Sequence, residues 1–456
     1  MNSKQLPPPH FLQPLQAWVQ RIYNAFRELA KPLQEWRDGS RLVSTKFLGC
    51  LLVLMLGTLP FLENAQTGVI GVAAAIAWLM LWLSDRPEKS RSLWTPIHTP
   101  LLSYWFIAVL ATLFTAPNVR MAALDGLLKL TIYLLAFVSL NRVMGAGWRS
   151  LLVGAYLVST LIASAYGVQQ WYLGAPELAT WTDPTSESAG ITRVYSFLGN
   201  PNLFAGYLMA ALPLGATAAL RWQSWGLKTL SAITALAGGF CIVQTQSRGG
   251  LLGLAATLLT LGLLLVYWWG KRLPNWTLPA ALGGMAGAIA LGTVVIPALR
   301  TRVLSIFGTA DSSNAFRVNV WAAVIDMIKA RPLLGIGTGN KAFNLVYPLY
   351  QRSGYSALGT YSVPLEITVE TGIIGFICYG WLVATAIYQG WLILNRLRSD
   401  RDADGLWVIA AISMIAGMMV HGLFDTVWFR PQVQLVWWLA IALISSLYVA
   451  PTSEDS

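Results

Sequence analysis

Arginines and carboxylates in the second half of the chain stand out chemically against an apolar sequence. Arg248 lies in TQSRGGLLG, Arg317 in SSNAFRVN, and Glu366 and Glu370 in VPLEITVETG. A guanidinium group binds phosphate or carboxylate through two parallel hydrogen bonds. An arginine at the edge of an apolar segment is costly unless it is paired or faces a wet cavity. These residues therefore predict an anion site. The alternative is interfacial snorkelling or ion pairing with Glu366, Glu370 or Asp425.

Two further pairs of residues have helical spacing. Asp125 and Lys129 are one turn apart in an apolar run and form the clearest candidate for an intramembrane charge pair, either structural or functional. His421 and Asp425 share this spacing in HGLFDTVWFR, where a histidine could relay protons or simply pack between helices. The three histidines lie far apart, and the three cysteines share no metal-ligand or disulfide spacing. We therefore expect no metal and no cofactor.

Composition places the chain among membrane proteins. It is 55% hydrophobic and 11% charged over 456 residues, whereas about a quarter of the residues in a soluble domain are charged. Apolar runs of membrane-spanning length recur and do not alternate as barrel strands do, so the predicted fold class is an all-α polytopic membrane protein in a lipid bilayer. The net charge of +11 is spread over short loops. This distribution favours membrane orientation over nucleic-acid binding.

The apolar runs predict about twelve transmembrane helices. About nine lie in residues 47–297 and three in residues 364–449, with a long polar interval at 298–363 between them. Basic residues are unevenly divided between alternate short loops, with twelve on one side and four on the other. The positive-inside rule then puts both termini, residues 1–46 and 450–456, in the cytoplasm and the polar interval outside. We expect the protein in the plasma (inner) membrane.

The polar interval is expected to contain one helix. It should start near Ser313, a suitable N-cap, and end at Arg331 because Pro332 follows. Apolar residues recur on one face of this helix: Phe316, Val320, Val324 and Met327. The pattern predicts an amphipathic helix that lies on the outer membrane surface.

Two other segments have local signatures. In GIGTG, the glycines Gly335, Gly337 and Gly339 alternate. A helix rather than a strand precedes them, so the run predicts a tight turn and not a dinucleotide site. In residues 1–46, apolar residues recur at helical spacing with basic residues on other faces. That pattern predicts either a helix on the cytoplasmic membrane surface or a plain basic tail.

Four motifs in order along the chain carry a family resemblance: FLGNPNLFAGY, TQSRGGLLG, AFRVNVWAAVIDMIKARPLLGIGTGN and VPLEITVETGIIGF. With them the sequence resembles the O-antigen ligase and polymerase-related membrane superfamily, from about residue 40 to residue 445. Within it, the overall likeness is to the cyanobacterial IctB group of inorganic-carbon (bicarbonate) transporters. The resemblance implies an O-antigen-ligase-like fold.

The resemblance also assigns roles to single residues. Ligases of this superfamily move a sugar chain from a polyprenyl diphosphate carrier to an acceptor outside the membrane, without a metal. Arg248 stands where the family has an arginine thought to hold the diphosphate, and Arg317 matches another arginine of the outer loop. The family's suspected base is a histidine ten intervening residues before a glycine. Counting back from Gly372 gives Tyr361 instead, and a tyrosine is a poor base at neutral pH.

Two functions follow, and the sequence leaves open whether the protein is an enzyme. The first is inorganic-carbon accumulation, with bicarbonate as the ligand. The second is ligase-like transfer from a polyprenyl-diphosphate-linked glycan, and binding of the lipid carrier without catalysis is a third option. In each case we expect an outward-facing anion site lined by Arg248, Arg317, Tyr361 and Glu370.

Overall fold

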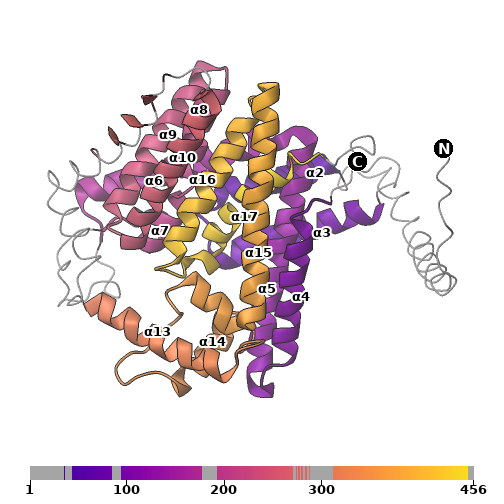
Figure 1. The fold of residues 1–456 in the computed structure, drawn as a ribbon, viewed down its shortest axis with the longest axis vertical. Helices are drawn as coiled ribbons and strands as arrows, with labels where there is room; N and C mark the ends of the chain where they lie inside the picture. The colour runs from indigo at the N-terminus through magenta and orange to yellow at the C-terminus, as the bar shows by residue number, and fades with distance from the viewer. Residues whose placement is uncertain are drawn as a thin grey trace.

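The computed structural model describes residues 44–84, 94–176, 193–270 and 312–449, together with Glu35 and a few positions between 271 and 311. Throughout these residues the secondary structure is helical, without a strand (Figure 1). Seven segments are long and apolar enough to cross a membrane, and Thr45–Thr58, His98–Leu113 and Pro431–Ser445 are shorter apolar helices. The predicted all-α polytopic membrane fold is confirmed.

Helices form where the sequence predicts spans. The following helices correspond to the predicted spans before the polar interval: α2 Thr45–Thr58, α3 Asn64–Ser84, α4 His98–Leu113, α5 Pro117–Val143, α6 Arg149–Leu173, α7 Pro201–Leu208, α8 Ala211–Arg221, α9 Trp225–Gln244 and α10 Arg248–Trp269. Three more correspond to the spans after it: α15 Val363–Asp400, α16 Gly405–Gly422 and α17 Pro431–Ser445. The predicted helix in residues 1–46 and the predicted span at 277–297 lie almost entirely outside the described residues.

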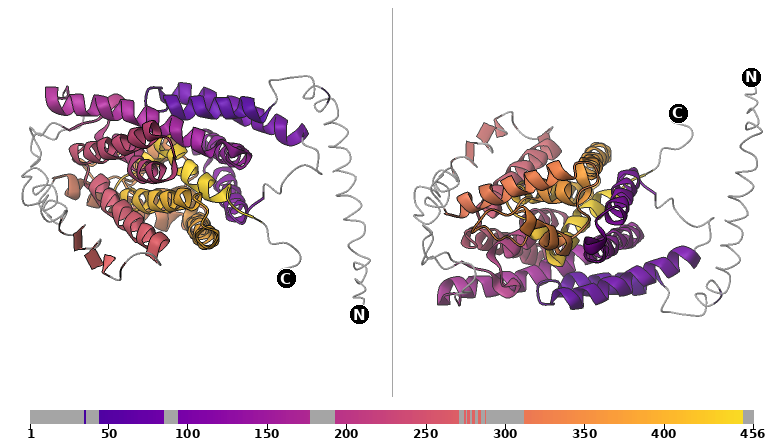
Figure 2. Two further views of the ribbon diagram at one scale, coloured as in Figure 1. Left: turned by 90° about the horizontal axis from the view of Figure 1, so that it is seen from above. Right: turned by 90° about the horizontal axis from the view of Figure 1, so that it is seen from below.

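The last two helices form the centre of the bundle. Nearly every residue of α16 and α17 is buried, and Trp407 and Trp437 are among the largest fully enclosed side chains. Figure 2 shows these yellow helices surrounded by the others, with the indigo helices along one flank. A helix that is apolar on all sides is stable only when protein or lipid covers it completely. Here other helices provide most of that cover.

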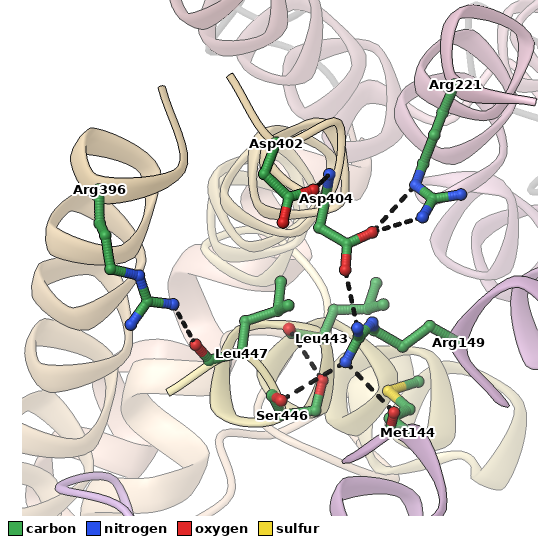
Figure 3. Close-up of polar contacts among 9 residues, drawn as sticks. All are labelled: Met144, Arg149, Arg221, Arg396, Asp402, Asp404, Leu443, Ser446 and Leu447. Atoms are coloured by element: carbon green, nitrogen blue, oxygen red, sulfur yellow. Dashed lines mark hydrogen bonds and ion pairs between the residues drawn. The ribbon is translucent and has the colours of Figure 1, made fainter. Parts of the chain in front are cut away.

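A buried carboxylate ties several helices together at one end of the bundle (Figure 3). Asp404, just before α16, accepts from Arg149 Nη2 at 2.7 Å and from Arg221 Nη2 at 2.5 Å. Arg149 also donates to the carbonyl of Met144, and Arg396 donates to that of Leu447. Removing one member of such a network leaves partly buried charges without partners. The contacts therefore fix α6, α8 and α16 relative to one another.

Helix α15 is interrupted near its start. Gly372 has φ +70° and ψ −176°, so the backbone leaves the helical conformation there although both sides are helical. A break inside a membrane protein is tolerated only where other groups satisfy the freed backbone. Ile336 N donates to Val369 O at 2.9 Å and Gly337 N donates to Glu370 O at 3.1 Å. The GIGTG run therefore supplies the missing donors.

The three alternate glycines let this run approach two helices closely. Gly335, Gly337 and Gly339 all have positive φ, so the predicted tight turn is present. A Cβ on Gly335 would meet the carbonyl of Val369, and one on Gly339 would lie 2.6 Å from the Cα of Gly126 in α5. Residues 335–339, here called the glycine segment, thus pack between α15 and α5.

The helix expected in the polar interval is α13, Ser312–Ala330, and it ends at the residue before Arg331. We expected its apolar face to lie on the membrane surface, but other residues of the protein cover this face instead. Val320, Val324 and Met327 are buried in a cluster with Phe343 of α14, Asn340–Val346. The protein itself covers this face, and Figure 1 shows α13 and α14 together at one end of the bundle.

Replacing Gly372 by alanine should destabilise the protein by roughly 2–4 kcal/mol, because the positive φ disfavours a side chain and the new Cβ would meet the Leu333 carbonyl. Thermal unfolding in detergent measures the effect. Gly380→Ala is the matched control, since Gly380 lies in the same helix with open space around it. Equal unfolding temperatures for the two variants would contradict this account of the break.

Candidate functional site

Arg248 is the first residue of α10 and is held by a tight helix start. The side chain of Ser247 caps the helix by accepting from Gly250 N at 3.2 Å. A Cβ on Gly249 would lie 2.8 Å from His421 Cδ2, and one on Gly250 would lie 2.8 Å from Ala205 Cβ. The two glycines therefore let the start of α10 pack directly on α16 and α7.

A hydrogen bond joins Arg248 to α13, the helix that carries Arg317. Arg248 Nη1 donates to Asn314 Oδ1 at 2.7 Å, and Arg317 lies about one turn further along α13. The buried Nε of Arg317 has no hydrogen-bond partner among the residues that the structure describes. The fold thus brings together two arginines, Arg248 and Arg317, that are far apart in the sequence.

His421 lies beside the start of α10. It is 3% exposed at the end of α16, packed between the glycines Gly206, Gly249 and Gly253. Within the described part of the chain its Nε2 has no hydrogen-bond partner. The charges of Asp425 and Arg317 both act on this imidazole. The His421–Asp425 pair noted in the sequence is therefore located beside the arginines.

A chain of hydrogen bonds fixes Asp425. Its Oδ2 accepts from Asn202 Nδ2 at 2.7 Å, and its Oδ1 accepts from Val427 N at 3.1 Å. Asn202 in turn accepts from Arg193 Nη2 at 3.0 Å, and Arg193 also donates to the carbonyl of Thr245. The carboxylate is held in place on the His421 side of the site.

Tyr361 lies in the same region, in the loop before α15. Its φ of +55° is rare for a residue with a side chain, and its ring packs edge-on against Phe316 of α13 at 5.7 Å. Burial, and then the negative charge of Asp425, raise the pKa of the Tyr361 phenol above its usual value, while Arg317 opposes the rise. The phenol is protonated at neutral pH, so it can donate a hydrogen bond but is not a base.

We call Arg248, Arg317, Tyr361, His421 and Asp425 the arginine cluster. Its components come from the start of α10, from α13, from the loop before α15 and from the end of α16. A small cavity of about 10 Å³ lies beside His421 and Asp425, which is room for about one water molecule. Two guanidinium groups, a phenol donor and a histidine–carboxylate pair could bind an anion and accept a proton.

Glu370 does not join this cluster, contrary to our expectation of one cavity lined by Arg248, Arg317 and Glu370. It lines a different cavity of about 120 Å³, together with Asp125 and Lys129. The reason is the break at Gly372: the glycine segment covers the first turns of α15, and Gly339 donates a backbone hydrogen bond to the Glu370 carboxylate.

Asp125 and Lys129 form an ion pair of 2.8 Å. The sequence reading did not identify Lys341 of α14, which contacts the same carboxylate at 3.2 Å. Nor did it connect Asn202 with Asp425. Those contacts join residues more than 200 positions apart, and no local pattern in the sequence marks them.

Comparisons with known proteins agree with the resemblance found in the sequence. A family model described as O-antigen ligase matches residues 233–380. That interval includes Arg248, Arg317, Tyr361 and Glu370. The O-antigen ligase of Pseudomonas aeruginosa PAO1 is 23% identical over 402 residues, which cover 82% of this chain and 90% of that protein. These matches support the superfamily, whereas the narrower likeness to the IctB group finds no support in them.

The raised pKa of Tyr361 can be measured. We expect the difference in phenolate absorbance between wild type and Tyr361→Phe to titrate above pH 10, because burial and Asp425 favour the neutral phenol. In an Arg317→Ala background the same difference should move to still higher pH, since the opposing positive charge is gone. A Tyr361 that ionises at lower pH than an ordinary tyrosine would instead make this residue a candidate base.

Proposed function

We propose that this O-antigen-ligase-like polytopic membrane protein transfers a glycan from a polyprenyl diphosphate carrier to a hydroxyl of an acceptor at the arginine cluster. The observation that carries the proposal is the hydrogen bond from Arg248 to Asn314, which brings Arg248 next to Arg317. A diphosphate has two adjacent anionic groups, and paired guanidiniums match them. We place the cluster outside the cytoplasm in the plasma membrane, with both termini inside.

In the proposed reaction, the bond between the anomeric carbon and the diphosphate oxygen breaks. A new bond forms between that carbon and the acceptor oxygen, and the acceptor hydroxyl loses its proton. Arg248 and Arg317 hold the diphosphate and stabilise the charge that develops on the leaving oxygen. Tyr361 donates a hydrogen bond to the same anion, which is the role left to a protonated phenol.

The proton needs an acceptor, because this chain lacks a histidine at position 361. We assign that role to His421, which has Asp425 beside it and an unpartnered Nε2. A water in the small cavity would carry the proton to it. Asp425, held by Asn202 and Val427, would stabilise the resulting imidazolium.

Inorganic-carbon accumulation is the competing function, and the comparisons favour glycan transfer over it. Deleting the gene in the native host distinguishes the two. We expect loss of a surface glycan and accumulation of its lipid-linked precursor. Complementation by Arg248→Ala or Arg317→Ala should fail, whereas Arg120→Ala, an arginine at the start of α5 outside the cluster, should restore the glycan. An unchanged glycan profile with weakened bicarbonate uptake would overturn the proposal.

The role of His421 has its own test. His421→Gln should lower the transfer rate by roughly 10²–10⁴, the usual contribution of general acid–base catalysis, while binding of polyprenyl diphosphate by the purified protein stays within a few-fold of wild type. Arg317→Ala should instead weaken the binding of polyprenyl diphosphate. If His421→Gln transfers glycan at the wild-type rate, another group accepts the proton.

A further inference from the structure

The second cavity is more than a packing defect. Its volume is about 120 Å³, and it lies between α4, α5, α15 and α17, with Thr338–Asn340 forming part of its wall. Seven aromatic residues contribute to its lining: Tyr104, Tyr133, Tyr379, Trp428, Phe429, Trp437 and Trp438. We call it the tryptophan cavity. Its size is a little below the roughly 150 Å³ of an apolar cavity that binds benzene, which is the scale of one six-membered ring.

Five residues that line this cavity carry buried polar atoms without a hydrogen-bond partner in the described part of the chain. They are Oε1 of Glu370, Oη of Tyr379, Oε1 of Gln434, Nε1 of Trp437 and Nε1 of Trp438. Each of these residues is at most 7% exposed. An unpaired buried polar group costs roughly 1–3 kcal/mol. Five of them around one cavity indicate that a bound molecule supplies their partners.

One side of the cavity is charged. Asp125 and Lys129 line it, and their side chains are 33% and 58% exposed. Lys341 pairs with the same Asp125 carboxylate and is 63% exposed. Solvent-exposed ion pairs are weak, so the pairs of Asp125 with Lys129 and Lys341 can break without a large loss of stability.

The polar atoms select the chemistry of the ligand. An anion would leave the acceptor oxygens of Glu370 and Gln434 without donors, and the nearby Lys129 is already paired with Asp125. A cation would leave the two indole N–H groups of Trp437 and Trp438 without acceptors. Hydroxyl groups both donate and accept, so a neutral polyol can satisfy the indoles and the carboxylate together. The aromatic faces suit the apolar face of a sugar ring.

We propose that the tryptophan cavity is a binding site for one neutral, hydroxyl-rich ring, the size of a single sugar unit. Trp428 lines both this cavity and the small one beside His421, which puts the ring next to the arginine cluster. As a sugar subsite of glycan transfer the role rests on the proposed function. The binding itself does not, because no member of the arginine cluster lines the cavity.

The test is binding of free sugars to the purified full-length protein in nanodiscs, measured by saturation-transfer NMR and calorimetry. The probes are D-glucose, N-acetyl-D-glucosamine and myo-inositol, with bicarbonate and tetramethylammonium as charged probes. We expect at least one neutral probe to bind and both charged probes to bind more weakly. Preference for a charged probe, or no binding of any neutral probe by folded protein, would overturn the proposal.

Conservative variants locate the binding. Trp437→Phe and Trp438→Phe keep an aromatic ring and remove one donor, so each should weaken sugar binding by about fivefold or more. Trp407→Phe is the matched control, because its indole Nε1 is also buried without a partner but Trp407 does not line the cavity. Equal losses for Trp407→Phe and Trp437→Phe would place the effect in general packing.

Two readouts separate this proposal from the proposed function. Arg317→Ala should abolish transfer and leave sugar binding unchanged, whereas Trp437→Phe should weaken sugar binding and leave polyprenyl diphosphate binding unchanged. Sugar binding without any transfer activity would refute glycan transfer and keep the cavity assignment. Transfer with no sugar binding at this cavity would do the opposite.

Discussion

The fold depends on the contact between the glycine segment and the break in α15. At Gly372 the helix gives up its own hydrogen bonds, and Ile336 and Gly337 donate to the carbonyls that become free. An interrupted helix in a membrane needs other groups to satisfy its freed backbone, and the glycine segment provides them. The same segment is fixed on its other side, where Thr338 donates to the Ala123 carbonyl of α5. The polar interval is thereby anchored within the helix bundle.

This contact positions both candidate sites. On one side Thr338–Asn340 forms a wall of the tryptophan cavity. On the other, Asn340 donates to the Leu358 carbonyl, which holds the loop that leads to Tyr361. A change in the position of the glycine segment between α15 and α5 would therefore move both sites. The two sites are therefore linked mechanically although they share no charged residue.

The sequence predicted the parts that depend on local pattern. Apolar runs located the helices from α2 to α10, and proline and arginine marked the end of α13 at Ala330. It could not place Glu370, because the break at Gly372 is stabilised by residues more than thirty positions earlier, such as Ile336. For the same reason α13 was assigned to the membrane surface. Its apolar face has partners in α14 that only the folded chain brings near.

Because Tyr361 stands where related ligases have a histidine, two roles in the proposed reaction fall to different elements. Tyr361 in the loop before α15 binds the anion, and His421 in the helix bundle accepts the proton. A phenol with a raised pKa can donate a hydrogen bond to an anion, but it cannot take the proton of the acceptor hydroxyl. His421 belongs to α16, one of the two central helices of the bundle, where Gly206, Gly249 and Gly253 pack against it. In the proposed reaction the loop and the start of α10 then bind the carrier, while the geometry of the proton acceptor is set by helix packing.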